Sequence, residues 1–257
     1  YPPGAQAIYL LSYLIAPSNL FFLKGIFIGF DVITCVALAF LLRRKGLDMS
    51  RCIIYAWCPL PIIEFAIEGH LDALTITFTV LAILCAGASW RGSRAVTGFL
   101  IAMAALTKIY PIILLVVVVR RRDWALLTTC FVTIIIAYVP YLILGHGQIL
   151  GFFGIYASEQ TPNAGLTQFV VVWIENQFLL NRAIGSIVIY VLDVILVGTA
   201  SFIILRLRWQ ERISMEAAIF IMIGTIYAAS SHIFPWYNSA FLPWIATQIA
   251  PLGIQWK

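Results

Sequence analysis

The chain has 257 residues, of which 62% are hydrophobic and 11% charged, and its formal net charge is +5. A soluble domain is about a quarter charged. A core of this size could not bury so much apolar surface, so the excess must face lipid. This composition excludes a soluble enzyme, a disordered chain and a disulfide scaffold. The five cysteines are odd in number and form no CxxC pair, so we interpret them as small hydrophobic residues.

Apolar runs of about the length of a membrane helix follow one another along the chain. They lack the alternation of barrel strands, so they predict an all-α, polytopic transmembrane helical bundle that forms a single domain over residues 1–257. We expect about nine membrane helices if one run is a hairpin of two short helices. The runs cover residues 20–42, 52–67, 73–88, 95–119, 124–144, 183–205, 217–231 and 234–251.

Basic residues gather in the polar joints between these runs. Loops rich in Lys and Arg stay on the cytoplasmic side of a membrane. Placing four joints and the C-terminus inside accounts for 13 of the 16 basic residues and leaves only Lys24, Lys108 and Arg182 elsewhere. The joints that we assign to the cytoplasm lie at residues 43–51, 91–94, 120–122 and 206–212.

The run over residues 95–119 has arginines at both ends, so a single straight span would put one basic cluster outside. Two short passes that meet near Lys108 keep both clusters inside. Pro111 supports a break there, because proline cannot continue a helix without losing a hydrogen bond. We therefore predict a short hairpin with Lys108 at its tip, facing outward.

The opposite, outer face then collects the remaining polar residues. Residues 1–17 are expected to form a helix along the outer surface, and residues 145–182 an external loop that is either a functional lid or a structured cap. The three histidines, His70, His146 and His232, all fall on this face.

Glu68, His70 and Asp72 lie two residues apart at this face and could converge on a polar substrate or a metal ion. Asp72 also stands where a helix N-cap is expected, and a cap can still face a substrate.

Lys108 within an apolar run is costly and suits a phosphate group, although its side chain could instead extend to the membrane interface. His232 and Trp236 offer a polar and aromatic edge, with an aromatic belt as the alternative for Trp236. Asp31 and Asp193 lie in predicted spans. We favour a hydrogen bond to a neighbouring helix as the role of each, with a proton relay as the alternative.

The order of these motifs resembles the GT-C superfamily of integral-membrane glycosyltransferases. It is most similar to the bacterial polyprenol-phosphate-dependent mannosyl- and arabinofuranosyltransferases and to the mannosyltransferase of GPI-anchor assembly. The matching motifs are Tyr1-Pro2-Pro3, Phe30-Asp31, Trp57-Cys58-Pro59-Leu60, Glu68-Gly69-His70-Leu71-Asp72-Ala73-Leu74, Ala105-Leu106-Thr107-Lys108-Ile109-Tyr110-Pro111 and His232-Ile233-Phe234-Pro235-Trp236-Tyr237.

The resemblance implies transfer of a sugar from a polyprenyl-phosphate carrier to a lipid-linked or glycan acceptor at the outer face of a membrane, most simply the bacterial inner membrane. Glu68, His70 and Asp72 would form the catalytic side of the site. Such families carry their key acidic residue in a first external loop after a first helix. Because the sequence starts just after that point and has no initiator Met, we expect a natural N-terminal part to precede it. The donor phosphate would be held by Lys108, Tyr110, His232 and Tyr237.

No cofactor is expected, with a divalent metal ion left open, and no motif indicates a metal or nucleic-acid site. The expected partners are the polyprenyl-phosphate sugar, the acceptor, membrane lipids and, on one reading, a larger membrane complex. Two other functions stay open from the sequence. One is a non-catalytic membrane subunit built on the same scaffold, and the other is a proton-coupled transporter that uses Asp31 and Asp193.

Overall fold

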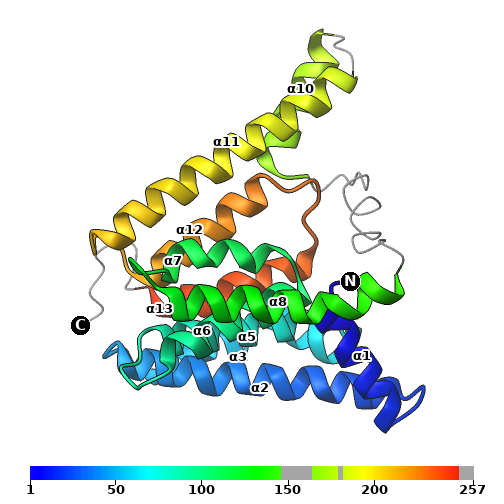
Figure 1. Cartoon of the computed structure of the whole chain (residues 1–257). Coiled ribbons are helices and arrows are strands. Elements are labelled where there is room, and N and C mark those ends of the chain that lie inside the picture. The colour runs from blue at the N-terminus through cyan, green and yellow to red at the C-terminus, as the bar shows by residue number, and fades with distance from the viewer. Residues whose placement is uncertain (146–163, 179–181, 249–257) are drawn as a thin grey trace.

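The structure is a computed structural model that describes residues 1–145, 164–178 and 182–248 (Figure 1). Every regular element in these ranges is helical, which confirms the all-α fold for this part of the chain. The longer helices are α1 (Pro3–Ile15), α2 (Leu20–Arg44), α5 (Asp72–Ala86), α6 (Ser93–Thr107), α8 (Trp124–Leu144), α10 (Leu166–Phe178), α11 (Arg182–Trp209) and α12 (Met215–Ala228).

Short helical segments join these helices. These segments are η1 (Met49–Cys52), α3 (Ile53–Ala56), α4 (Pro59–Pro61), the π-helix η2 (Ile62–Glu68), η3 (Tyr110–Leu114), α7 (Leu115–Val118), η4 (Pro235–Phe241) and α13 (Leu242–Thr247). Four of them, α4, η3, η4 and α13, carry proline in their first turn, where its missing N–H costs nothing.

The expected nine membrane helices are not confirmed. In the described ranges, three helices are long and apolar enough to cross a membrane: α2, α8 and α11 from Ile184 onward. A fourth span results if the segments Met49–Ala56 and Pro59–Glu68, bent by 49° at their break, count as one. The helices α5, α6 and α12 are apolar but shorter. Proline breaks and short helices thus replace several of the continuous spans expected from the sequence.

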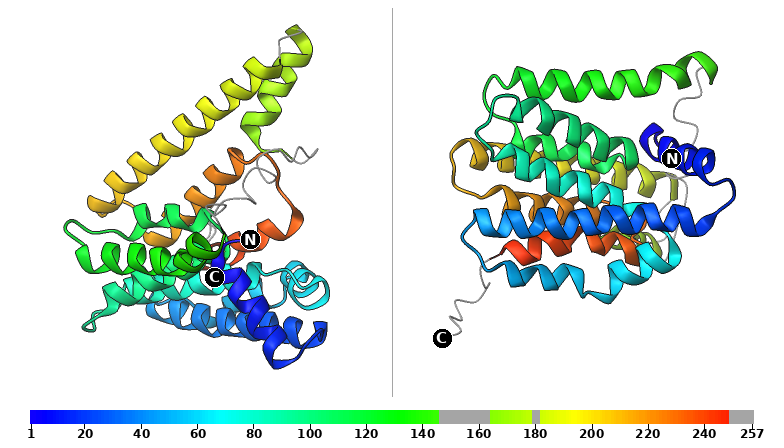
Figure 2. Two further views of the ribbon diagram at one scale, coloured as in Figure 1. Left: turned by 45° about the vertical axis from the view of Figure 1, so that its right-hand side comes forward. Right: turned by 90° about the horizontal axis from the view of Figure 1, so that it is seen from below.

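The helices α2, α5, α6 and α8 pack in sequence, each against the next (Figure 2). Buried threonines join them, with a 2.8 Å hydrogen bond between Thr34 and Thr77 and another between Thr75 and Thr107. A Cβ atom on Gly98 would lie only 2.2 Å from the carbonyl oxygen of Leu126, so α6 and α8 approach closely. Small residues and buried hydroxyls of this kind are typical of helix contacts in membranes.

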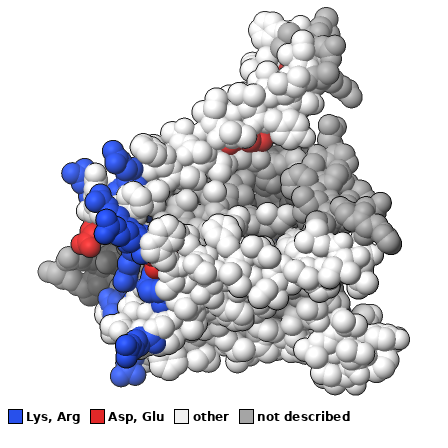
Figure 3. All heavy atoms as spheres, in the orientation of Figure 1, with Lys and Arg blue, Asp and Glu red and all other residues white. Residues whose placement is uncertain are grey.

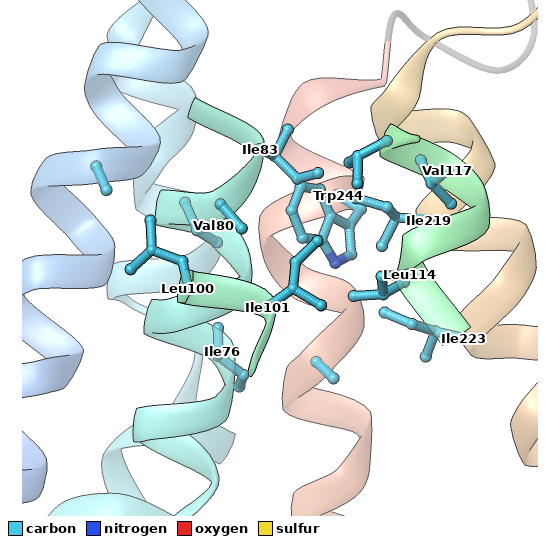
Figure 4. Close-up of a cluster of buried hydrophobic side chains, with 14 of the residues drawn as sticks. Ile76, Val80, Ile83, Leu100, Ile101, Leu114, Val117, Ile219, Ile223 and Trp244 are labelled. Atoms are coloured by element: carbon cyan, nitrogen blue, oxygen red, sulfur yellow. The ribbon is translucent and has the colours of Figure 1, made fainter. Parts of the chain in front are cut away.

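The C-terminal helices close the other side of this core. Trp244 of α13 is 1% exposed and lies among aliphatic side chains of α5, α6, η3, α7 and α12 (Figure 4). The helix α10 and the first part of α11 project from the bundle in Figures 1 and 2, whereas α11 packs against α7 and α12 nearer its end. Most large apolar side chains of α11 are exposed. α10 falls within the expected external loop, so the described part of that loop is structured.

All four basic joints lie at one end of the molecule, as Figure 3 shows. Arg94 donates to the carbonyl oxygen of Val118 at 2.7 Å, and Arg208 donates to that of Val117 at 2.9 Å. Both ends of the run over residues 95–119 therefore meet at this end, which we call the basic end, and the run folds back on itself as predicted. That its two halves enter a membrane stays a prediction. The break in the hairpin and the start of α1 lie at the opposite end, which we call the polar end.

Candidate functional site

The polar end brings together three segments that are far apart in the sequence. These are the junction of η2 and α5, the break between α6 and η3, and η4, which contacts α5. α1 packs across the same end, because a Cβ atom on Gly4 would lie 2.8 Å from the carbonyl oxygen of Leu106 in the last turn of α6. The predicted surface helix is thus at this end, and its position relative to lipid stays a prediction.

Lys108 and Asp72 form an ion pair at the centre of this site. The Nζ atom of Lys108 lies 2.6 Å from Oδ1 of Asp72, and the two side chains are only 16% and 8% exposed. α6 ends at Thr107 and Lys108 is extended, so its side chain turns toward the start of α5. The same Nζ atom lies 4.0 Å from the centre of the Tyr237 ring, a cation–π distance.

Lys108 lies at the tip of the hairpin, as expected, and its side chain turns toward Asp72. The side of the membrane that this tip faces stays a prediction. One detail of the prediction for Asp72 is wrong. Asp72 is the first residue of α5 rather than its N-cap, which is Leu71, and its side chain makes no cap hydrogen bond. Its carboxylate is used by Lys108 instead.

His70 lies beside this pair against an aromatic surface. Its ring stacks on Trp236 at 3.9 Å with 15° between the planes, and Trp236 stacks on Phe234 at 4.6 Å. On its other side, Nε2 of His70 lies 3.4 Å from a carboxylate oxygen of Glu64. The backbone N–H of His70 donates to the carbonyl oxygen of Glu64 at 2.8 Å, so η2 and the loop hold the imidazole in place.

Glu68 is exposed at the end of η2, and its carboxylate makes no hydrogen bond or ion pair to another residue of the described part. Gly69 follows with φ of +81°, a left-handed conformation that glycine adopts without strain. Lys24 of α2 approaches this glycine, and its Nζ atom donates to the carbonyl oxygen of Ile67. The turn that carries Glu68 is therefore anchored from α2.

The three other predicted phosphate ligands, His232, Tyr237 and Tyr110, differ in burial, and His232 is the most buried. His232 is fully buried, with Nδ1 3.0 Å from the hydroxyl of Ser231, and its ring centre is 6.4 Å from that of Tyr237. The backbone carbonyl of Tyr237 accepts a hydrogen bond from Tyr227. Tyr110 begins η3, is half-buried and lines a cavity of about 10 Å³ near Trp244, and its role as a phosphate ligand stays a prediction.

Tyr9 of α1 also lies close enough to Asp72 to respond to its charge. Burial, the neighbouring Tyr1 and the Asp72 carboxylate together raise the pKa of Tyr9 to about 12. Tyr9 therefore keeps its hydroxyl proton at neutral pH, so the side of the site nearest α1 presents a neutral phenol.

The intramembrane acids have the role that the sequence favoured. Asp31 accepts a hydrogen bond from Tyr55 at 2.5 Å, and Asp193 accepts one from Thr167 at 2.6 Å. Both bonds join neighbouring helices. The remaining histidine, His146, lies outside the described residues.

Sequence analysis missed Glu64 and the anchoring role of Lys24. Glu64 lies inside the apolar run over residues 52–67, and an acid in such a run is itself a signal of a functional or paired group. The five cysteines are free, and Cys130 is buried while the other four are half-buried. In the described ranges, no three His, Cys, Asp or Glu side chains come close enough to hold a metal ion.

These features define a class, namely an α-helical membrane protein with a polar, aromatic-lined site at the end opposite its four basic joints. Comparison with known protein families matches residues 1–249 to glycosyltransferase family 87. The chain belongs to this family and is a membrane glycosyltransferase. No curated protein and no solved structure matches the chain.

Proposed function

We propose that this protein is a GT-C-type enzyme that transfers a sugar from a polyprenyl-phosphate carrier to a lipid-linked or glycan acceptor. The positive-inside rule supports a cytoplasmic basic end and an external active site. The bacterial inner membrane is the location that we propose. The observation that most supports this proposal is the Lys108–Asp72 pair, which holds a nearly buried cation at the polar end of a family 87 glycosyltransferase.

Lys108 is the donor-phosphate ligand in this proposal. A lysine ammonium has three donors, so Nζ can keep its contact with Asp72 and still donate to a phosphate oxygen. Asp72 then acts as a positioning residue that holds the ammonium at the end of α6. Tyr237, in contact with Lys108, and His232, next to Tyr237, support the same phosphate, and Tyr110, two residues after Lys108, is the fourth proposed ligand.

Glu68 is the general base in this proposal, because its carboxylate is exposed while that of Asp72 is paired. The acceptor hydroxyl gives its proton to Glu68 while its oxygen forms a bond to the anomeric carbon of the sugar. The bond from that carbon to the phosphate oxygen breaks, and polyprenyl phosphate leaves beside Lys108. The stacked rings of His70 and Trp236 offer a flat apolar face to the sugar.

The experiment is turnover of a radiolabelled polyprenyl-phosphate sugar by the purified natural full-length protein in liposomes. Glu68→Gln should lower kcat about a hundredfold, within the range for loss of a general base, with little change in the KM for donor. Asp72→Asn should chiefly raise the donor KM. Absence of turnover with polyprenyl-phosphate pentoses and hexoses would favour the non-catalytic subunit. A larger kcat loss in Asp72→Asn than in Glu68→Gln would assign the base to Asp72.

A further inference from the structure

The basic end contains a cavity that the proposed reaction does not use. Its volume is about 340 Å³, within the range of small-molecule sites, and it opens between α5, α6, α7 and the end of α11. Four arginines line it together with the indole of Trp209 and a set of small and aliphatic residues. The arginines are Arg94, Arg120, Arg121 and Arg208.

Backbone carbonyl groups hold most of these guanidinium groups in place. Arg208 donates to the carbonyl oxygens of Val117 at 2.9 Å and Ile213 at 2.5 Å, and Arg120 donates to that of Ala86 at 3.2 Å. Arg121 lies over the Trp209 ring at 5.5 Å. A carbonyl fixes the position of a guanidinium without neutralising its charge, so the cavity is lined by preorganised cations.

Three carboxylates, those of Asp123, Glu211 and Glu216, lie close enough to act on these arginines, but few direct ion pairs form among the described residues. In the described part of the chain, only Arg94 of the four pairs with a carboxylate, that of Asp123. Glu211 also lines the cavity, but it forms no ion pair with any described residue. The positive-inside rule explains why arginines lie at this end, and exposed side chains would satisfy it. It does not explain why they surround a cavity and are anchored by backbone groups.

We infer that this cavity binds the phosphate group of an anionic lipid headgroup. Guanidinium groups present paired donors that match phosphate oxygens. Basic pockets between membrane helices on the cytoplasmic side are suited to such headgroups. The exposed Trp209 beside the cavity, at the end of a helix long enough to span, is placed where tryptophans meet the membrane interface. The cavity is thus a second lipid site, at the other end of the molecule from the transfer reaction.

The test is titration of the purified full-length protein in neutral detergent, with lipid-bound species counted by native mass spectrometry. The probes are phosphatidylglycerol, phosphatidylcholine and inorganic phosphate. Phosphatidylglycerol should bind more tightly than phosphatidylcholine, and Arg121→Gln should weaken that binding about fivefold, the effect of one cation near a charged lipid. Arg208→Gln should weaken it at least as much. Arg43→Gln, an exposed arginine of the same end outside the cavity, is the matched control and should change it less than twofold.

Equal binding by Arg121→Gln, Arg43→Gln and the unsubstituted protein would overturn the inference. Arg121 makes no hydrogen bond through its side chain in the described structure, so its variant tests binding even if Arg208→Gln fails to fold. The lipid assignment would also be overturned if inorganic phosphate bound as tightly as phosphatidylglycerol and its binding depended on the same arginines. The cavity would then be a site for a soluble phosphate. Sugar transfer by Arg121→Gln should be unchanged in detergent. A loss of lipid binding in this variant can therefore be told apart from a failure of the proposed glycosyltransferase function.

Discussion

Two lysine–carboxylate pairs with the same nitrogen–oxygen distance lie at opposite ends of the molecule. Lys108 and Asp72 are 2.6 Å apart at the polar end, and Lys45 and Glu216 are 2.6 Å apart at the basic end. Both pairs join helices distant in sequence, and both carboxylates are nearly buried. Their surroundings differ.

The Lys108 pair lies beside an imidazole, an exposed carboxylate and stacked aromatic rings, whereas the Lys45 pair joins α2 to α12 among arginines. An ion pair is therefore no sign of function by itself. The groups around the pair and its position in the molecule distinguish a candidate site from a structural contact.

Replacing the lysine of each pair by alanine tests most directly whether the two pairs differ in function. Lys108→Ala should lower sugar transfer about a hundredfold or more, because it deletes the cation proposed to stabilise the leaving phosphate. Lys45→Ala should leave transfer per folded molecule unchanged, although it also leaves a buried carboxylate without its partner. Donor binding and turnover measured on both variants check this, and unchanged donor binding by Lys108→Ala would refute its role as a phosphate ligand.

Asp123 offers a structural counterpart to Asp72. It accepts hydrogen bonds from Nε of Arg94 at 3.1 and 3.2 Å and from the backbone N–H of Arg120 at 3.1 Å. Asp123→Ala should destabilise the protein by about 2 kcal/mol, because Arg94 loses its only carboxylate in the described structure but keeps two carbonyl acceptors. Thermal unfolding in detergent measures the loss, and transfer below the melting temperature should not change. A specific loss of transfer would mean that the two ends are coupled.

The sequence predicted the parts of this picture that depend on local pattern. The bounds of α8, the basic end and the break near Lys108 follow from hydropathy, charge and Pro111, each readable within one segment. The turn of Lys108 toward Asp72 was not predictable in this way, since it depends on how closely α5 approaches α6. Glu64 was missed because one apolar run was taken as a continuous span, whereas the structure divides it into short helices.

The aromatic surface at the polar end should matter less than the cation. Trp236→Ala removes the ring on which His70 and Phe234 stack, and we expect transfer to fall about tenfold, the scale of removing one packed aromatic ring. Trp124→Ala is the control, because Trp124 is 71% exposed at the start of α8. Steady-state kinetics with both substrates measure the effect. Equal changes in the two variants would assign Trp236 to the membrane interface, the alternative that its sequence position left open.

The smallest expected effect is the loss of thermal stability that the basic end contributes as the pH is lowered. Burial opposes ionisation of Asp123, but the hydrogen bonds from Arg94 and Arg120 outweigh it and hold the pKa of Asp123 below its ordinary value. A carboxyl with a lowered folded-state pKa contributes its stability above the unfolded pKa, about 3.9, and loses it as the pH falls through the folded pKa. The melting temperature of the unsubstituted protein should therefore exceed that of Asp123→Asn at pH 6, and the gap should narrow below about pH 4. Glu211→Gln removes a carboxylate of the same end that forms no ion pair with a described residue, so its melting temperature should equal that of the unsubstituted protein at pH 6. If the difference in melting temperature for Asp123→Asn stayed constant at all pH values, packing rather than charge would stabilise this end of the bundle.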